Sequence, residues 1–382
     1  MAPMAKTFDI CIRGAGIVGR TLALHLAAKR LRVALLAHEA PTDAAHSDVR
    51  AYALSPASRT LLEAIRCWPD ETHATPVTRM QVQGDGGEPV VFEAQTQGAA
   101  ALNWIVDVPV LENLLKEAVR FQPLIEMVTH PVPAELTVVC EGRASKTRAE
   151  FGVEFDVKPY HQWALAARVE CALPHGQVAR QWFDQGDILA LLPLDGPKGR
   201  LCALVWSLRP ERAQELQDAL PAEFCQQLRA ASQGAMGDCT LSSERKVWAL
   251  QAAQARRWVG TAQGASWLLA GDAAHNVHPL AGQGLNLGLG DVAELVNILD
   301  HRAYWRSVGD PKLLRAYERA RKADFALVGG SGDALQQIFQ NQHPAWQTLR
   351  SVGMRGFENS GPFKHWVAAR AMGGRLHAAA KT

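Results

Sequence analysis

The chain has 382 residues, of which 48% are apolar and 20% are charged. This balance fits a folded globular protein and excludes an intrinsically disordered one. The 40 basic and 38 acidic side chains leave a net charge of only +2, so nothing in the composition predicts a nucleic-acid partner. The seven cysteines are scattered and form no CxxC pair. They argue against a disulfide framework or a zinc site and suit a reducing cytosol.

The two ends of the chain bear on its location. The start, MAPMAKTFDICIRGAG, has no apolar stretch typical of a signal peptide. The run LRVALLA at 31–37 is too short to span a bilayer. We therefore expect a cytoplasmic protein. Near the C-terminus, FKHWVAARAMGGRLH (363–377) fits a basic amphipathic helix, which either packs on its own domain or makes peripheral contact with the inner face of an anionic membrane.

The first part of the chain reads as alternating strands and helices. A buried strand at 8–13, a helix at 16–30 and a strand at 31–37 form a βαβ unit, whose right-handed crossover makes the two strands parallel neighbours. Ser55 is the expected N-cap of the next helix, with Pro56 at its first position. Further elements are expected as strands at 77–83, 89–94 and 134–142, and as helices at 55–66 and 109–121.

Between residues 160 and 207 the pattern changes to antiparallel strands separated by turns such as LDGPKG. Residues 211–232 read as helix with a break at Pro221, 265–272 as a buried strand, and the following segment as a helix to about Asp300. The remainder reads mostly as helix. Parallel βα segments at both ends with an antiparallel block between them predict an α/β protein of two interleaved domains.

The string GAGIVG places Gly14, Gly16 and Gly19 at GxGxxG spacing, after a strand and at the start of a helix. In that context the three glycines predict a dinucleotide site, with the pyrophosphate at the helix N-terminus. An acidic residue that binds the ribose should follow about 20 positions on. The second strand ends at Ala37 instead, and Glu39 either reaches around to the ribose or is a solvated loop charge.

The segment LAGDAAHNVHPLAGQGLNLGLGDVAELV (269–296) contains five glycines, although a glycine inside a helix costs about 1 kcal/mol. Asp272 follows a buried strand, where a carboxylate can accept from sugar-alcohol hydroxyls. Backbone N–H groups from Gly282 to Asn286 would point at an anionic or carbonyl-rich ring, such as reduced flavin. His275 and His278 lie three apart, but without a third ligand nearby they are expected to pack or hydrogen-bond and not to hold a metal.

This segment resembles the second flavin motif of aromatic hydroxylases related to para-hydroxybenzoate hydroxylase, the group A flavoprotein monooxygenases. It is most similar to their ubiquinone-biosynthesis branch. DVRAYALSPASRTLLEAIRCW (48–68) is similar to that branch's Arg-Ala-x-Ala-Leu-Ser segment, and matching stretches extend over nearly the whole chain.

The resemblance implies bound FAD, reduction by NADH or NADPH as transient co-substrate, and reaction with dioxygen to a flavin hydroperoxide that hydroxylates an aromatic ring. The substrate it implies is a polyprenylated phenol or quinone precursor, with other ubiquinone-biosynthesis proteins as partners. No side chain is singled out as general acid or base, because the cofactor carries the chemistry. The cofactor-binding set is Gly14, Gly16, Val18, Gly19, Glu39, Arg50, Asp272, Pro279, Gly282, Gly284, Leu285 and Asn286.

The implied architecture is a discontinuous Rossmann-like FAD-binding domain (1–75, 102–150 and 251–320), an antiparallel-sheet substrate domain (76–101 and 151–250) and a C-terminal helical region (321–382). Three departures from the family pattern bear on FAD affinity. Ala37 stands at the acidic position, Glu141-Gly142 replaces an Asp-Gly turn, and the stretch from Phe121 to Leu136 is short. They motivate an alternative, a flavin-poor scaffold of a quinone-synthesis complex. A plain nicotinamide dehydrogenase would leave residues 269–290 unexplained.

Overall fold

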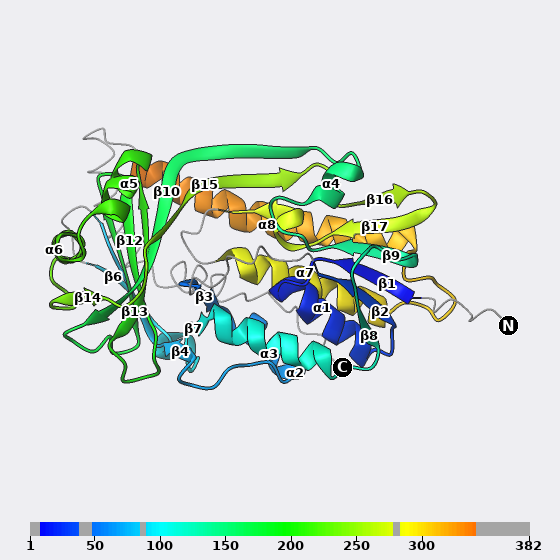
Figure 1. Ribbon diagram of the computed structural model, residues 1–382, viewed down its shortest axis with the longest axis horizontal. Coiled ribbons are helices and arrows are strands. Elements are labelled where there is room, and N and C mark those ends of the chain that lie inside the picture. The colour runs from blue at the N-terminus through cyan, green and yellow to red at the C-terminus, as the bar shows by residue number, and fades with distance from the viewer. Residues whose placement is uncertain (1–7, 38–47, 85–88, 278–282, 341–382) are drawn as a thin grey trace.

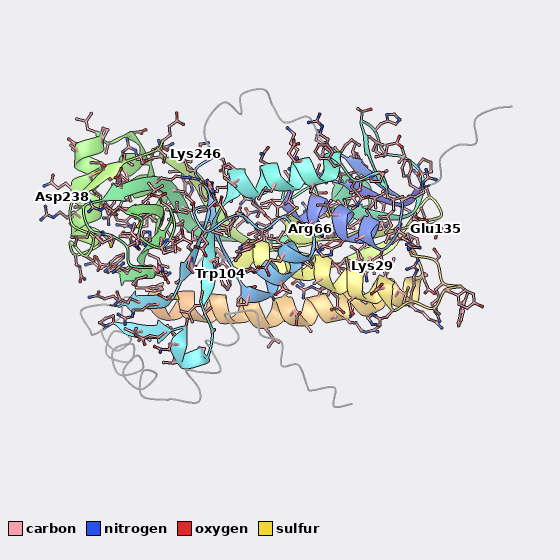
Figure 2. All side chains as sticks on the ribbon, turned by 90° about the horizontal axis from the view of Figure 1, so that it is seen from below. Lys29, Arg66, Trp104, Glu135, Asp238 and Lys246 are labelled. Carbon is pink, nitrogen blue, oxygen red and sulfur yellow. The ribbon has the colours of Figure 1, made fainter. Side chains whose placement is uncertain are left out.

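A computed structural model of the chain describes residues 8–37, 48–84, 89–277 and 283–340. The molecule is elongated, with an antiparallel sheet at one end and a parallel sheet at the other (Figure 1). Viewed from below, Asp238 lies at the antiparallel end, and Lys29 and Glu135 lie toward the opposite end (Figure 2). None of the described helices combines the length and apolar character needed to cross a bilayer.

The parallel sheet is built on the predicted βαβ unit. Its strand order is β16-β17-β9-β1-β2-β8, and every neighbouring pair is parallel except β16 and β17. The core residues Ile10, Ile12, Val33 and Leu35 are fully buried, which the apolar runs in the sequence predict. The strands are β1 (Phe8–Arg13), β2 (Val33–Leu36), β8 (Ile125–Val128), β9 (Ala134–Val139), β16 (Val259–Ala262) and β17 (Ala265–Leu269).

Helices pack on this sheet and on one another. Helix α1 contacts both α3 and α7, and α7 contacts α8. Ser55 caps α2 as predicted, because its hydroxyl accepts from the Ser58 N–H, and Pro56 occupies the first turn. The helices are α1 (Ile17–Ala28), α2 (Pro56–Ala64), α3 (Val108–Arg120), α4 (Lys146–Glu150), α7 (Gln283–Asp300) and α8 (Pro311–Gln340), with short 3-10 turns at Gln95–Gln97 and Gly271–Ala273.

The antiparallel sheet has the order β18-β15-β10-β13-β12-β11-β5-β6, with β14 paired to β10. Its neighbouring strands are antiparallel except β5 and β11, which are parallel. Helices α5 (Pro210–Asp218) and α6 (Pro221–Ala231) cover its outer face, where Phe224 and Leu228 pack against Trp206. The break predicted at Pro221 is present. The strands are β5 (Arg79–Gln83), β6 (Val90–Glu93), β10 (Phe155–Cys171), β11 (Val178–Asp184), β12 (Asp187–Pro193), β13 (Leu201–Leu208), β14 (Cys239–Leu241), β15 (Lys246–Ala255) and β18 (His275–Asn276).

Two features join the ends of the molecule. A small antiparallel sheet of β3 (Ala51–Leu54), β7 (Asn103–Asp107) and β4 (Ala74–Val77) lies between the larger sheets. The long strands β10 and β15 run from the antiparallel sheet toward the parallel one (Figure 1). Their register shifts between Pro159 and Trp163, and His161 there adopts a φ of +54°. The α/β class with parallel and antiparallel sheets is therefore confirmed. The sequence patterns did not predict the strands β3, β4, β7, β8, β14, β15, β16 and β18.

The glycine turn allows a matched test of packing. A Cβ at Gly19 would lie 1.9 Å from the Gly14 carbonyl oxygen, whereas a Cβ at Gly16 would meet no atom within 4 Å. We expect Gly19→Ala to lower the free energy of unfolding by about 1–3 kcal/mol, the usual cost of overpacking. Gly16→Ala should stay within about 0.5 kcal/mol of the parent. Urea denaturation measures both, and equal stability of the two variants would contradict the packing role of Gly19.

Candidate functional site

A cavity of about 670 Å³ lies where the parallel sheet, the small sheet and the inner face of the antiparallel sheet meet. The glycine turn, strand β3 and the segment around η2 (Gly271–Ala273) form one side, and strands β10 to β13 form the other. Of the predicted cofactor-binding residues, those that line it are Gly16, Val18, Arg50, Asp272, Gly284 and Leu285.

The three glycines of the turn divide into two roles. Gly14 has a φ of +113°, and a Cβ on it would lie 2.4 Å from the Cys140 carbonyl oxygen. Gly19 allows helix α1 to approach the turn, as described above. Gly16 is the N-cap of α1, faces the cavity with open space above it, and no side chain caps the helix there. The N-terminal N–H groups of α1 are therefore available to an anionic ligand.

The glycines of the 269–296 segment have different neighbours from those the sequence suggested. A Cβ at Gly288 would lie 2.9 Å from Val18, one at Gly271 3.3 Å from Val18, and one at Gly290 2.9 Å from the Arg321 guanidinium. Gly288 and Gly290 therefore make room for side chains of the protein, and Gly271, which also borders the cavity, leaves space for Val18. Gly284 alone of the four described has open space around it and borders the cavity.

A buried group of charges holds this segment in place. Asp291 is 0% exposed, and its Oδ2 accepts hydrogen bonds from the Gly271 N–H at 2.8 Å and from His275 Nε2 at 2.7 Å. Its Oδ1 accepts from Arg321 Nε at 2.7 Å, and Arg321 also donates to the Leu287 carbonyl at 3.1 Å. Burial alone would raise the pKa of Asp291, but His275 and Arg321 outweigh it and hold that pKa below its ordinary value.

Asp272 follows Gly271, whose N–H binds Asp291, and it borders the cavity. Burial raises the pKa of its carboxyl, and the nearby His275 and Arg143 oppose the shift. Asn276 donates to it at a long 3.4 Å. The carboxylate thus has acceptor capacity left for hydroxyl groups entering the cavity.

Asn286 is not among the residues that line the cavity, and its side chain binds other groups of the protein. Its Oδ1 accepts from the Ser55 N–H at 2.9 Å and from the Ser58 hydroxyl at 2.7 Å, and its Nδ2 donates to the Ala53 carbonyl at 2.8 Å. The side chain therefore ties helix α7 to strand β3 and the N-terminus of α2. It positions two walls of the cavity relative to each other.

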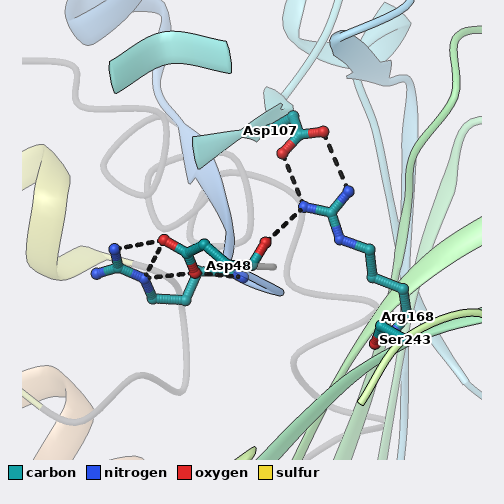
Figure 3. Close-up of polar contacts among 5 residues, drawn as sticks. Asp48, Asp107, Arg168 and Ser243 are labelled. Carbon is teal, nitrogen blue, oxygen red and sulfur yellow. Dashed lines mark hydrogen bonds and ion pairs between the residues drawn. The ribbon is translucent and has the colours of Figure 1, made fainter. Parts of the chain in front are cut away.

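Arg50 lines the cavity as an oriented cation. Its guanidinium Nε lies 2.9 and 3.0 Å from the two carboxylate oxygens of Asp48, and its Nη2 lies 2.6 Å from Asp48 Oδ2 (Figure 3). Glu112 is 3.7 Å away. The hydrogen bond to Asp48 raises the pKa of Arg50 above its ordinary value, so the residue stays cationic.

The opposite wall is an apolar sheet face that the sequence analysis did not identify. Alternation along β10 to β13 sends the large side chains, including Leu165, Trp182 and Trp206, to the helix-covered face. The cavity face includes four alanines beside larger residues such as Leu192, and one cross-strand row runs from Ala166 through Val205 and Ala190 to Gln181. We call this face the alanine floor; its cavity-lining members are Ala166, Ala179, Gln181, Ile188, Ala190, Leu192, Ala203, Val205 and Ser207.

Glu141, the first of the two altered positions, is part of the local structure. Its carboxylate accepts from the Ser145 hydroxyl at 2.8 Å, from the Thr147 N–H at 3.0 Å and from the Thr147 hydroxyl at 2.7 Å. Glu141 therefore satisfies the N-terminus of α4, while Gly142 beside it borders the cavity at a φ of +78°. The longer side chain is accommodated without closing the cavity.

The second altered position, Ala37, follows β2 directly and leaves no carboxylate there. Glu39 lies outside the described residues, as do His278, Pro279 and Gly282. His275 is held by Asp291 and lies 4.8 Å from the Trp258 ring, centroid to centroid. In the described part of the chain, no group of three or more His, Cys, Asp or Glu side chains could hold a metal ion.

Known proteins are similar to this chain in sequence and in fold. A family model described as an FAD binding domain matches residues 88–328. The ubiquinone hydroxylase UbiL of Rhodospirillum rubrum is 30% identical, with 96% of this chain and 90% of the relative covered. The 3-demethoxyubiquinol 3-hydroxylase of Escherichia coli is 28% identical, with 96% and 98% covered.

Among solved structures, PqsL of Pseudomonas aeruginosa, a probable FAD-dependent monooxygenase, has a TM-score of 0.72 at 22% identity, covering 91% of this chain and 99% of its own. The p-nitrophenol 4-monooxygenase PnpA of Pseudomonas putida also has a TM-score of 0.72, at 19% identity, covering 97% and 99%. These structures share the fold, while the family model and the 30% identity to UbiL show that the chain belongs to the family of FAD-dependent monooxygenases. Within that family its sequence is similar to the ubiquinone hydroxylases, which confirms the resemblance read from the motifs.

The buried anchor leads to a prediction about stability and pH. Asp291→Asn leaves Arg321 without its buried carboxylate, and we expect the free energy of unfolding to fall by about 3–5 kcal/mol at pH 7. Because the pKa of Asp291 is lowered by folding, its stabilisation is present above the unfolded pKa of about 4 and is lost as the pH falls below it. On acidification, the free energy of unfolding of Asp291→Asn should therefore fall less than that of the parent protein.

Denaturation by urea between pH 2 and 7 measures both effects. The control is Asp300→Asn, which removes an exposed carboxylate that pairs with Lys29 at 2.7 Å and should change stability little. If Asp291→Asn lowers the free energy of unfolding no more than Asp300→Asn does, the anchoring role of Asp291 is contradicted.

Proposed function

We propose that this protein is an FAD-dependent monooxygenase that hydroxylates a large, apolar aromatic ring, such as a polyprenylated phenol or quinone precursor, using NADH or NADPH and dioxygen. The observation that carries the proposal is one continuous cavity, which runs from a dinucleotide-type glycine turn to the alanine floor. Two similar ubiquinone hydroxylases support the substrate class.

The residues present fit FAD. We place the pyrophosphate at Gly16, where a Cβ would meet nothing within 4 Å, and the flavin ring between Arg50 and the Gly284–Leu285 end of α7. Asp272 would accept from the ribityl hydroxyls. When bound, FAD supplies the redox chemistry that takes two electrons from the nicotinamide and transfers one oxygen atom of dioxygen to the ring.

The protein's own contribution is electrostatic and steric. Arg50 and the N-terminus of α1 place positive charge where reduced flavin and the pyrophosphate carry negative charge. The alanine floor leaves room for a flat ring and keeps water away from it, while Gln181 and Ser207 supply polar atoms at its edge.

The scarcity of charge among the sheet residues that line the cavity supports a neutral substrate. Among the described sheet residues that line the cavity, Arg180 alone is charged, and its Nη1 donates to the carbonyls of His175 at 3.1 Å and Val178 at 3.4 Å. A carboxylate substrate would call for a cation free to bind it. An apolar ring with a hydroxyl or carbonyl group fits the floor better.

The direct test of the function is the visible absorption spectrum of the purified protein before and after incubation with FAD and removal of the excess. We expect bound flavin, and an oxidation of NADH or NADPH that accelerates when a prenylated phenol is added. Protein that takes up no FAD would overturn the proposal and favour a scaffold role.

The missing acidic residue gives a gain-of-binding prediction. Ala37→Glu places a carboxylate at the end of β2, where it can accept from the adenosine ribose, and we expect the Kd for FAD to fall about 3- to 10-fold, equivalent to ~1 kcal/mol. Ala37→Gln is the matched neutral control. Fluorescence titration with FAD measures the three proteins, and an unchanged or weaker Kd for Ala37→Glu would argue against this placement of the ribose.

The alanine floor gives a prediction about substrate size. Ala190 and Val205 are the partly exposed members of the central row, so Ala190→Leu adds bulk to partly open space. We expect KM for a prenylated phenol to rise about 10-fold, or ~1.4 kcal/mol, with a smaller change for an unsubstituted phenol. Ala230→Leu on the exposed face of α6 is the control. Equal losses for both substrates would contradict the role of the floor.

A further inference from the structure

Arg168 lies on β10, where its backbone is fixed from both sides. It pairs with Ala203 in the ladder to β13. Its N–H donates to the Ser243 hydroxyl at 2.8 Å, and its carbonyl accepts from the Ser242 N–H at 2.8 Å. The base of this side chain therefore belongs to the rigid antiparallel sheet.

The guanidinium of Arg168 reaches across to two segments of the FAD-binding part (Figure 3). It forms a fork with Asp107, in which Nη1 lies 3.1 Å from Oδ2 and Nη2 lies 2.7 Å from Oδ1. Nη2 also donates to the backbone carbonyl of Asp48 at 3.3 Å. Arg168 and Asp107 are each only 17% exposed at the side chain, so water screens the fork weakly.

These contacts converge on the segment that carries Arg50. Asp107 ends β7 and pairs with Ala51 of β3. The neighbouring Val108 N–H approaches the Arg50 carbonyl at 3.4 Å. Asp48 in turn clasps the Arg50 side chain through both carboxylate oxygens, and also accepts from the Arg50 N–H at 3.0 Å.

The direction of the Arg50 guanidinium thus depends on where the Asp48 backbone is held. The carbonyl contact from Arg168 is a hydrogen bond that joins the Asp48 backbone to the antiparallel sheet. Lys246 of β15 also attracts the Asp48 carboxylate through its charge. The Asp107 fork orients Arg168 for that contact, because a bidentate pair fixes the plane of the guanidinium. Asp107 therefore orients Arg168, Arg168 holds the Asp48 backbone, and Asp48 directs the Arg50 guanidinium.

We propose that Arg168 is a positioning residue, which sets the Arg50 guanidinium against the flavin by holding the Asp48 carbonyl. One side chain thereby connects the alanine floor to the segment that carries Arg50, since Arg168 lies in the same cross-strand row as Ala203 and Leu192 of the floor. This inference rests on the proposed function, because it places FAD beside Arg50.

The test is a double-mutant cycle on FAD binding with Arg50→Ala, Arg168→Ala and the double variant. If Arg168 acts through Arg50, we expect each single variant to raise the Kd for FAD about 10-fold and the double variant to match Arg50→Ala alone. The midpoint potential of bound FAD should move to more negative values in all three, since a cation near the reduced flavin is lost or displaced. A Kd for FAD that rises in the double variant by the product of the two single increases would show that the residues act independently, and it would overturn the proposal.

A charge swap distinguishes positioning of Arg50 from an ion pair that only stabilises the contact between the antiparallel sheet and the FAD-binding part. Arg168→Asp with Asp107→Arg can restore the ion pair but removes the donor to the Asp48 carbonyl. We expect the swap to recover thermal stability and not the FAD affinity or the potential; recovery of all three would overturn positioning. Arg212→Ala, which breaks a similar pair with Asp187 at 2.7 Å in the outer part of the sheet, should leave FAD binding unchanged. Failure of the parent protein to bind FAD would instead overturn the proposed function.

Discussion

The rest of the site depends on one buried carboxylate, that of Asp291. It binds a backbone N–H and an imidazole of the Gly271–His275 segment and a guanidinium of helix α8. Taking such charges out of water is costly, and only the complete set of partners compensates for it. Strand β17, helix α7 and helix α8 therefore have one mutual arrangement that satisfies all the groups. Asp272 and Gly284 border the cavity because that arrangement holds the chain on both sides of them.

The packing of small against large residues extends this constraint to the glycine turn. Val18 occupies the space left by Gly271 and Gly288, so helix α1 packs closely against the η2 turn and helix α7. Asn286 then connects α7 to β3, and Arg168 connects the chain before β3 to the antiparallel sheet. The walls of the cavity are thus joined in series by polar contacts, each of them between elements distant in sequence.

Much of the fold could be predicted from the sequence, and the reasons are local. GAGIVG between two apolar runs specifies the βαβ unit, and Ser55-Pro56 specifies a helix start. Strands β3 and β8 have four residues each, too few to show a period, and β10 is interrupted by Pro159 and a bulge. In the candidate site, spacing revealed that the glycines matter, but not that three of them face Val18 and Arg321. The contact between Arg168 and Asp107 joins residues 61 positions apart, and the alanine floor exists only through cross-strand register. Neither leaves a local signal.

The bulge in β10 has a mechanical consequence. Strands β10 and β15 remain hydrogen-bonded on both sides of the shift between Pro159 and Trp163. Sliding the two halves of the molecule past each other would break the ladder along its whole length, whereas flexing at His161 disturbs one irregular step. The irregular step is therefore the place along the β10–β15 ladder where bending disturbs the fewest backbone hydrogen bonds.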